Sequence, residues 1–312
     1  MCYLNINELK ELQNRIIAKN KKCNMIVSII VTGLVLSTLV IMIILKARFI
    51  HIIIASAFEL VFGLISLVII KLIVNGKDIS KFDNEFKNTF VLDGLKNTFD
   101  DLNYNIEEGF DEKTLSDYGM IDTADRYSSN DYISGTYKGI KFEQSDVHIE
   151  EKHESEDSDG NKTVHWVTIF RGRYMIFDFN KKFMANVQVV SNRFRAKSSP
   201  RDRKFSKVKL EDMEFNKMFD VYTDIEHDAF YILTPHFMQK IKSLYKNLDS
   251  PIMLCFVDNR LHIALDNGED SFEYNVFKPI NEEEINKDII KDIKLITDFV
   301  NELNLDNDLF RR

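Results

Sequence analysis

Hydrophobic positions are concentrated in two uninterrupted runs, Met25–Leu45 and Phe49–Ile70, which are separated by Lys46-Ala47-Arg48. As a helix, each run is long enough to cross a hydrocarbon core of roughly 30 Å. A linker of three residues joins two such helices only through a tight antiparallel turn. The pattern therefore predicts a transmembrane helical hairpin over residues 25–74.

Two other interpretations of these runs are less consistent with the sequence. Core helices seldom run for about twenty residues without a charge, and a signal peptide has a shorter apolar region followed by small residues at a cleavage site. Basic residues outnumber those of the turn on both outer sides of the hairpin, which predicts that both termini are cytoplasmic. The many Lys, Asn and Ile residues suggest a bacterial source, so we expect a multi-pass protein of the bacterial inner membrane.

Glu59 is an acidic residue near the middle of the second apolar run. An ionised carboxylate at that depth costs roughly 2–3 kcal/mol or more, and such residues usually face a partner or a cavity. Three interpretations remain open: a neutral Glu59 hydrogen-bonded within the hairpin, a contact for self-association or another membrane protein, and an ion pathway. Gly63 follows Glu59 at a spacing of four, which gives a face of small residues suited to close helix packing.

Helical spacing continues on both sides of the hairpin. Residues Asn5–Lys22 carry an apolar stripe and terminal lysines, which predicts an interfacial helix that continues into the first span. Asp78–Asp101 repeats phenylalanines at helical spacing, as expected of a stalk helix packed on the domain or of a face lying on the membrane. A short helix is predicted over Asp111–Tyr118. The predicted parts are 1–24 interfacial helix, 25–74 hairpin, 75–120 stalk and connecting helices, and 121–312 a cytoplasmic domain.

From Tyr132 to Arg195 the apolar period changes to two, which predicts antiparallel strands. The predicted strands are Ser134–Tyr137, Ile140–Gln144, Val147–Glu150, Thr163–Phe170, Tyr174–Phe179 and Ala185–Val190, with an acidic loop over 151–162. The later segments predict strands at 207–210, 219–223, 230–233, 252–257 and 261–265. Thr234-Pro235 begins one predicted helix, and Asn281 with Glu284 begins another. The fold class is therefore α+β, an antiparallel sheet with flanking helices.

Composition narrows the function classes. The chain has a net charge of −8, and the part after the apolar runs is more acidic still, which argues against nucleic-acid binding. Cys2, Cys23 and Cys255 are too few and too scattered for a disulfide framework or a metal cluster. We therefore expect no metal and no cofactor.

A polar segment precedes the first predicted strand. Between Asp122 and Gly135 it combines carboxylates, an arginine, hydroxyls and tyrosines, a composition common in ligand-binding loops. The candidate ligand residues are Asp122, Arg126, Asn130 and Asp131. The same residue types also favour turns and caps by hydrogen-bonding the nearby backbone, and this structural interpretation remains open.

A basic segment interrupts the acidic domain between Asn192 and Leu210. Its candidate lipid-contacting residues are Arg193, Arg195, Arg201, Arg203 and Lys204, because cations near a membrane gain about 1 kcal/mol each from anionic headgroups. The alternative is a solvated loop whose cations pair with carboxylates of the same domain.

No motif of known catalytic chemistry is present. The seven histidines show no metal-ligand spacing, and the chain lacks a nucleophile elbow and a phosphate-binding glycine loop. A grouping of distant residues such as Asp122, Arg126 and His148 remains the basis for a hydrolase-type alternative. We expect a protein that is not an enzyme.

Several blocks resemble a bacterial membrane-anchored family known as domain of unknown function 3137. The blocks are residues 125–135, 169–173, 177–180, 210–216, 229–235 and 261–264. The resemblance implies a pair of N-terminal membrane helices ahead of an α+β domain, supplies no catalytic residues, and makes a LemA-type membrane protein a candidate partner. The sequence thus predicts a membrane-anchored protein-binding or scaffolding module, with a lipid-surface module as the alternative.

Overall fold

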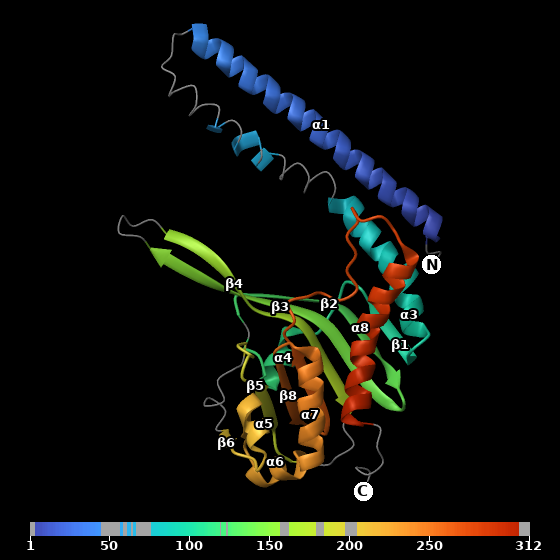
Figure 1. Ribbon diagram of the computed structural model, residues 1–312, viewed down its shortest axis with the longest axis vertical. Coiled ribbons are helices and arrows are strands. Elements are labelled where there is room, and N and C mark those ends of the chain that lie inside the picture. Colours follow the sequence, from blue (N-terminus) through green and yellow to red (C-terminus); the bar gives the residue numbers. More distant parts are fainter. Residues whose placement is uncertain are drawn as a thin grey trace. The chain divides into compact units, whose positions relative to one another are not determined.

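The three-dimensional structure is a computed structural model. It describes residues 4–44, 57–58, 61–63, 65–66, 76–118, 120–122, 124–156, 162–178, 184–196 and 205–305 (Figure 1). The chain forms two compact units, which are described separately below. The first comprises Met1–Val91 with Glu273–Ile285, and the second comprises Leu92–Phe272 with Asn286–Arg312.

The first unit is dominated by helix α1 (Ile6–Ile44), which runs without a break from the predicted interfacial segment through the first apolar run. The predicted continuity is confirmed, and Ile6–Thr38 is long and apolar enough to cross a membrane. This makes α1 a candidate membrane helix by length and composition. The turn at Lys46–Arg48, most of the second apolar run and Glu59 lie outside the described residues.

The described parts of the second apolar run are helical and pack against α1. A Cβ atom built on Gly63 would lie only 2.6 Å from Val31 Cγ2, so a larger residue at this position would require a shift. Phe58 and Phe62 line an apolar hollow of about 410 Å³ together with Val27 and other α1 residues. Gly63 therefore permits the close approach expected of a small-residue face.

The start of α1 is buried in protein. Leu9, Leu12 and Ile16 are almost completely inaccessible. The Gln13 amide donates to the carbonyls of Val276 (2.9 Å) and Lys278 (2.6 Å). The apolar side chains Leu9, Leu12 and Ile16 are thus covered by the unit itself, and the interfacial position expected for 1–24 stays a prediction.

Aromatic packing completes this unit. Residues 76–86 are helical and continue into a π-helical turn, η1 (Lys87–Val91). Phe82 and Phe86 are buried, and the Phe86 ring stacks on Tyr274 with centroids 4.9 Å apart. The phenylalanine repeat therefore forms core and not an exposed face.

Asp83 in this unit should titrate at an unusual pH. Partial burial, assisted by the charge of Glu273, raises the pKa of Asp83 to about 6. The folded state then binds more protons between pH 4 and 6, so stability falls as pH rises through that window. Replacing Asp83 by Asn should raise the free energy of unfolding by about 1 kcal/mol at pH 7.5, after allowance for solvent screening. Thermal unfolding of the full chain in detergent tests this, since the gain should vanish below pH 4.

The described residues of the second unit form a nine-stranded antiparallel sheet, ordered β1-β2-β3-β4-β9-β8-β5-β7-β6 (Figure 1). The sheet joins the middle part of the chain to the C-terminal hairpin through the pairing of β4 with β9. The strands are β1 (Asp100–Asn105), β2 (Arg126–Tyr137), β3 (Ile140–Glu156), β4 (Lys162–Asp178), β5 (Val187–Ser191), β6 (Ser206–Val208), β7 (Phe219–Thr223), β8 (Ile252–Val257) and β9 (Arg260–Leu265).

Helices cover both faces of this sheet. On one face the Phe299 ring of α8 contacts Phe177 of β4, and Phe237 of α7 contacts Phe256 of β8. On the other face Leu115 of α4 belongs to an apolar core with Val147 and Ile149 of β3. The helices are α3 (Leu92–Lys96), α4 (Glu112–Asp117), α5 (Met213–Met218), α6 (Glu226–Ile232), α7 (Pro235–Leu248) and α8 (Glu282–Leu303).

Three sequence-based expectations are wrong. The helix expected to reach Asp101 ends at Lys96, and residues 100–105 form β1 instead. Residues 230–233, expected as a strand, belong to α6 and its C-terminal cap. Residues 151–156, expected as loop, continue β3. The α+β class and the antiparallel sheet are confirmed.

Candidate functional site

The predicted ligand segment is largely strand. β2 begins at Arg126. Because this segment is a strand, its successive side chains point to opposite faces of the sheet. The Arg126 guanidinium lies over the Trp166 ring, 3.4 Å from its centroid, and 3.6 Å from a Glu150 carboxylate oxygen. Arg126 of β2 therefore contacts the adjacent strand β3 through Glu150 and the next strand, β4, through Trp166.

Asn130 and Asp131 lie at a bulge where the register of β2 against β3 shifts. Asp131 has a φ of 54° and is fully buried. One of its carboxylate oxygens accepts a hydrogen bond from the Tyr104 hydroxyl (2.6 Å), and the other accepts from the Asn130 amide (2.8 Å). The bulge thus turns Asp131 into the protein interior.

Asp131 belongs to a group of polar side chains between the sheet and α8, here named the buried polar cluster. It consists of the buried Asp131, Gln144, Asp146, Arg173 and Ser271, together with the partly buried Asp292 of α8. Arg173 donates to the Asp292 carbonyl (2.7 Å) and also to the Asp292 carboxylate. Asp146 accepts from the Ser271 hydroxyl (2.7 Å) and from the Ser271 backbone N–H. These bonds tie the loop before α8, and α8 itself, to the sheet.

The electrostatics of this cluster are set by burial. Loss of solvent raises the pKa of Asp146 to about 7, although Arg173 and the Ser271 hydrogen bonds act in the opposite direction. The Gln144 amide has no hydrogen-bond partner within the described parts of the chain. Since Arg173 bonds to Asp292 of α8 and Asp146 bonds to Ser271, the arrangement is suited to holding α8 in place.

Asp122 lies elsewhere, in an open hollow of about 480 Å³. Asp125, Glu151 and Arg195 also line the hollow, while Ala124, Ile169 and Ala196 supply its apolar part. Asp125 is already engaged, because its carboxylate accepts from the Lys152 backbone N–H at 2.7 Å.

The alternation of β3 separates the candidate residues further. His148 and Glu150 point to one face, where Arg126 also lies, and His148 is 4.0 Å from the Glu150 carboxylate. Glu151, which lines the Asp122 hollow, points to the other face. The structure therefore does not bring Asp122 together with Arg126 and His148.

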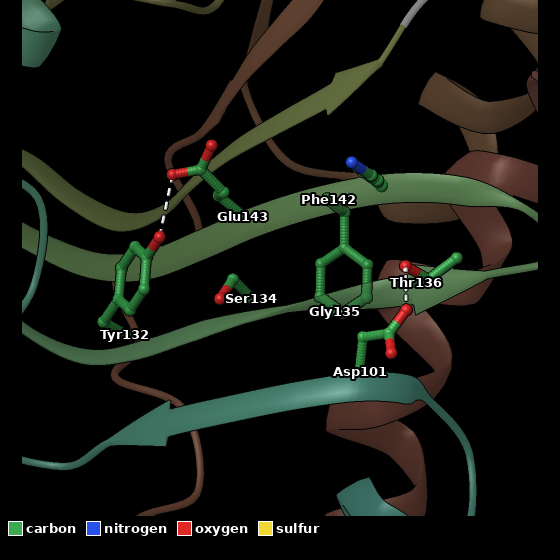
Figure 2. A pocket seen from close by; sticks show the side chains of 8 residues that line it. Asp101, Tyr132, Ser134, Gly135, Thr136, Phe142 and Glu143 are labelled. Atoms are coloured by element: carbon green, nitrogen blue, oxygen red, sulfur yellow. Dashed lines mark hydrogen bonds between the residues drawn. The ribbon is translucent and has the colours of Figure 1, made fainter.

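A second hollow of about 480 Å³ lies over β2 and β3, beside Asp101 of β1 (Figure 2). It forms where β1 shifts register opposite Gly135, which has no side chain to fill the space. Its lining is polar: the Tyr132 hydroxyl donates to Glu143 (2.8 Å), and Thr136 donates to Asp101 (3.4 Å). Burial, with the Glu143 hydrogen bond, raises the pKa of Tyr132, so this hydroxyl remains protonated at neutral pH.

The described part of the basic segment is engaged with the domain. Arg193 pairs with Asp249 at 2.8 Å, and Lys207 pairs with Asp220 at 2.7 Å. Arg195 lines the Asp122 hollow. Arg201, Arg203 and Lys204 lie outside the described residues. These pairs agree with the interpretation of a loop bound to the domain's own carboxylates, and lipid contact by this segment stays a prediction.

The most exposed feature of the sheet is the outer part of β3 and β4, here named the arm. It comprises residues 150–156 and 162–168, and Figure 1 shows these strands extending beyond the rest of the sheet. β2 pairs with β3 only as far as Glu150, and β9 pairs with β4 only from Arg173. Val164 and Val167 are each 45% exposed. The β-branched residues of 163–170 were the available sequence signal of this arm.

The described residues define an α+β protein with one large antiparallel sheet and a candidate membrane helix near its N-terminus. Residues 168–305 match the profile of a family described as Protein of unknown function (DUF3137). The match supports the family resemblance inferred from the sequence blocks, five of which lie within it. No curated protein and no solved structure matches the chain.

Proposed function

We propose that this chain is a membrane-anchored protein whose α+β domain binds another protein through the arm. Helix α1 supports the anchoring part, because Ile6–Thr38 meets the length and composition of a membrane span. The multi-pass topology, the bacterial inner membrane and the cytoplasmic termini belong to the same proposal. They are supported by the two apolar runs, the composition and the distribution of basic residues, respectively.

One observation carries the binding part of the proposal. Within the described parts of the chain, the arm is a two-stranded ribbon, and no third strand pairs with residues 151–156 or 162–168. Such ribbons have unpaired backbone groups along their edges, and proteins commonly bind extended segments by adding a strand there. The exposed Val164 and Val167 add apolar surface beside those groups.

Site-specific photo-crosslinking tests this proposal. A benzophenone amino acid at Val164 or Val167 of the full chain, expressed in its native membrane, should give an adduct with a protein. The matched control is Ile290 of α8, an aliphatic residue that is 62% exposed. The proposal fails if the arm positions give no protein adduct or no more than Ile290 gives. The same benzophenone amino acid can be placed at Arg195. A lipid adduct from that position, with no protein adduct from the arm, would favour the lipid-surface alternative.

A further inference from the structure

We infer that the outer edge of β4 pairs with the same edge of a second copy of this chain, so that two arms form one continuous antiparallel ribbon. This inference rests on the proposed function and names its partner.

Backbone groups of β4 in the arm point away from β3. The Lys152 N–H bonds the Asp125 side chain, so it points away from β4. Lys152 lies opposite Trp166. In an antiparallel ladder, opposed residues either exchange both hydrogen bonds or neither. Trp166 therefore directs its own N–H and C=O away from β3, and the alternation extends this to Val164 and Thr168.

The distribution of charge along β4 favours pairing with an identical strand. Residues 163–170 of β4 read Thr-Val-His-Trp-Val-Thr-Ile-Phe and contain no carboxylate, lysine or arginine. Natural sheets usually protect exposed edges with charged residues or proline; here Lys162 is at the end of the strand, and residues 163–170 contain neither a charged Lys, Arg, Asp or Glu nor proline. The stretch can face an identical strand without opposing carboxylates, lysines or arginines, and its valines and threonines favour strand pairing.

The β3 edge of the arm is less suited to pairing between two copies. β3 carries Glu150, Glu151, Glu154 and Glu156 against Lys152. The Lys152 N–H already donates a hydrogen bond to the Asp125 side chain. At Glu150 this edge of β3 is already paired with Arg126 of β2. A second β3 would bring acidic strands together. Pairing of β4 with β4 is also closed by a twofold axis, so it gives a dimer and not a filament.

A proline substitution tests the inference in the full chain in detergent. Proline at Val164 removes an outward N–H and leaves the bonds between β3 and β4 in place. Val164→Pro should raise the dimer dissociation constant about tenfold or more, measured by sedimentation velocity over a range of concentrations. Glu154→Pro is the matched control, because Glu154 lies opposite Val164 and faces the other edge. Fluorescence of Trp166, the single tryptophan, checks that the arm still folds.

Cysteine crosslinking gives an independent readout. In a chain whose three native cysteines are replaced by alanine, single cysteines are placed at each position from 164 to 168. A twofold axis should give efficient disulfide crosslinking at one or two adjacent positions, and none at a cysteine replacing Glu154. A dimer that persists in Val164→Pro, or crosslinks that do not depend on position, would overturn the inference.

The two proposals fail differently. If the chain is monomeric and the arm photo-crosslinks to a different protein, including a LemA-type protein, the inference is wrong and the proposed function stands. If the chain is monomeric and the arm gives no protein adduct, both are wrong.

Discussion

Replacing Arg173 by Met should lower the free energy of unfolding by about 3–5 kcal/mol, because it leaves the buried Asp146 and the partly buried Asp292 without their cation. The Arg173 side chain is 3% exposed and bonds to Asp292, and its charge also acts on the fully buried Asp146. The deficit should shrink at pH 5. Protonated Asp146 needs no cation, and the pKa of Asp146 is already raised to about 7 in the native protein.

The matched control is Arg171→Met on the same strand. Arg171 also pairs with an aspartate, Asp270, at 2.7 Å, but its side chain is 42% exposed. Its loss should cost less than about 1 kcal/mol. Thermal and urea unfolding followed by near-UV circular dichroism compares the two variants. Equal losses would show that the buried polar cluster does not hold α8 to the sheet.

The second large effect is acid destabilisation through His262. This residue is fully buried in β9, with its Nδ1 3.1 Å from the Tyr174 hydroxyl. Its Nε2 has no hydrogen-bond partner within the described parts of the chain. Burial, with a smaller contribution from Arg260, lowers the pKa of His262 to about 3. The imidazole is therefore neutral in the folded protein over the whole physiological range.

The sign of the pH dependence follows from this shift. The unfolded chain protonates His262 below about pH 6.5, while the folded protein does not until about pH 3. Stability should therefore fall by up to about 1.4 kcal/mol for each pH unit below 6.5. In His262→Leu this slope should be absent. Unfolding curves of both proteins at pH 7.5, 6.0 and 5.0 measure the difference, and parallel profiles would contradict the assignment.

Local signals in the sequence predicted much of the fold. The hairpin between β2 and β3 turns at Lys138-Gly139, both with positive φ, and that between β8 and β9 turns at Asp258-Asn259 in the same way. The Thr234 side chain caps α7 as expected, accepting from the Phe237 N–H at 3.3 Å. These features depend on a few adjacent residues, so the sequence is sufficient to predict them.

Elements held by distant partners were missed. The outer part of β3 is rich in glutamate, which is depleted in strands, yet pairing with β4 keeps it extended. Strand β1 reads Asp-Asp-Leu-Asn-Tyr-Asn, without apolar alternation, and is defined by its pairing with β2. The apolar run Ala229–Leu233 is too short for periodicity to distinguish helix from strand.

The candidate site was predictable only in part. Asp131 was a candidate because of the polar composition of its segment. The bulge that buries it depends on the register of β2 against β3. The polar run Gln144-Ser145-Asp146 inside an apolar strand was the available signal of the buried polar cluster. Its partners Arg173, Ser271 and Asp292 are far away in sequence, so only the folded chain identifies them.

The two-sided use of β3 limits how the length of this chain can vary. Asp146 faces the polar groups under α8, whereas Val147 faces the apolar core on the opposite side. A single residue inserted before Asp146 would exchange the two environments and place a carboxylate among aromatic rings. Insertions and deletions in related chains should therefore be rare around Asp146 and more frequent in residues 151–156, which are exposed.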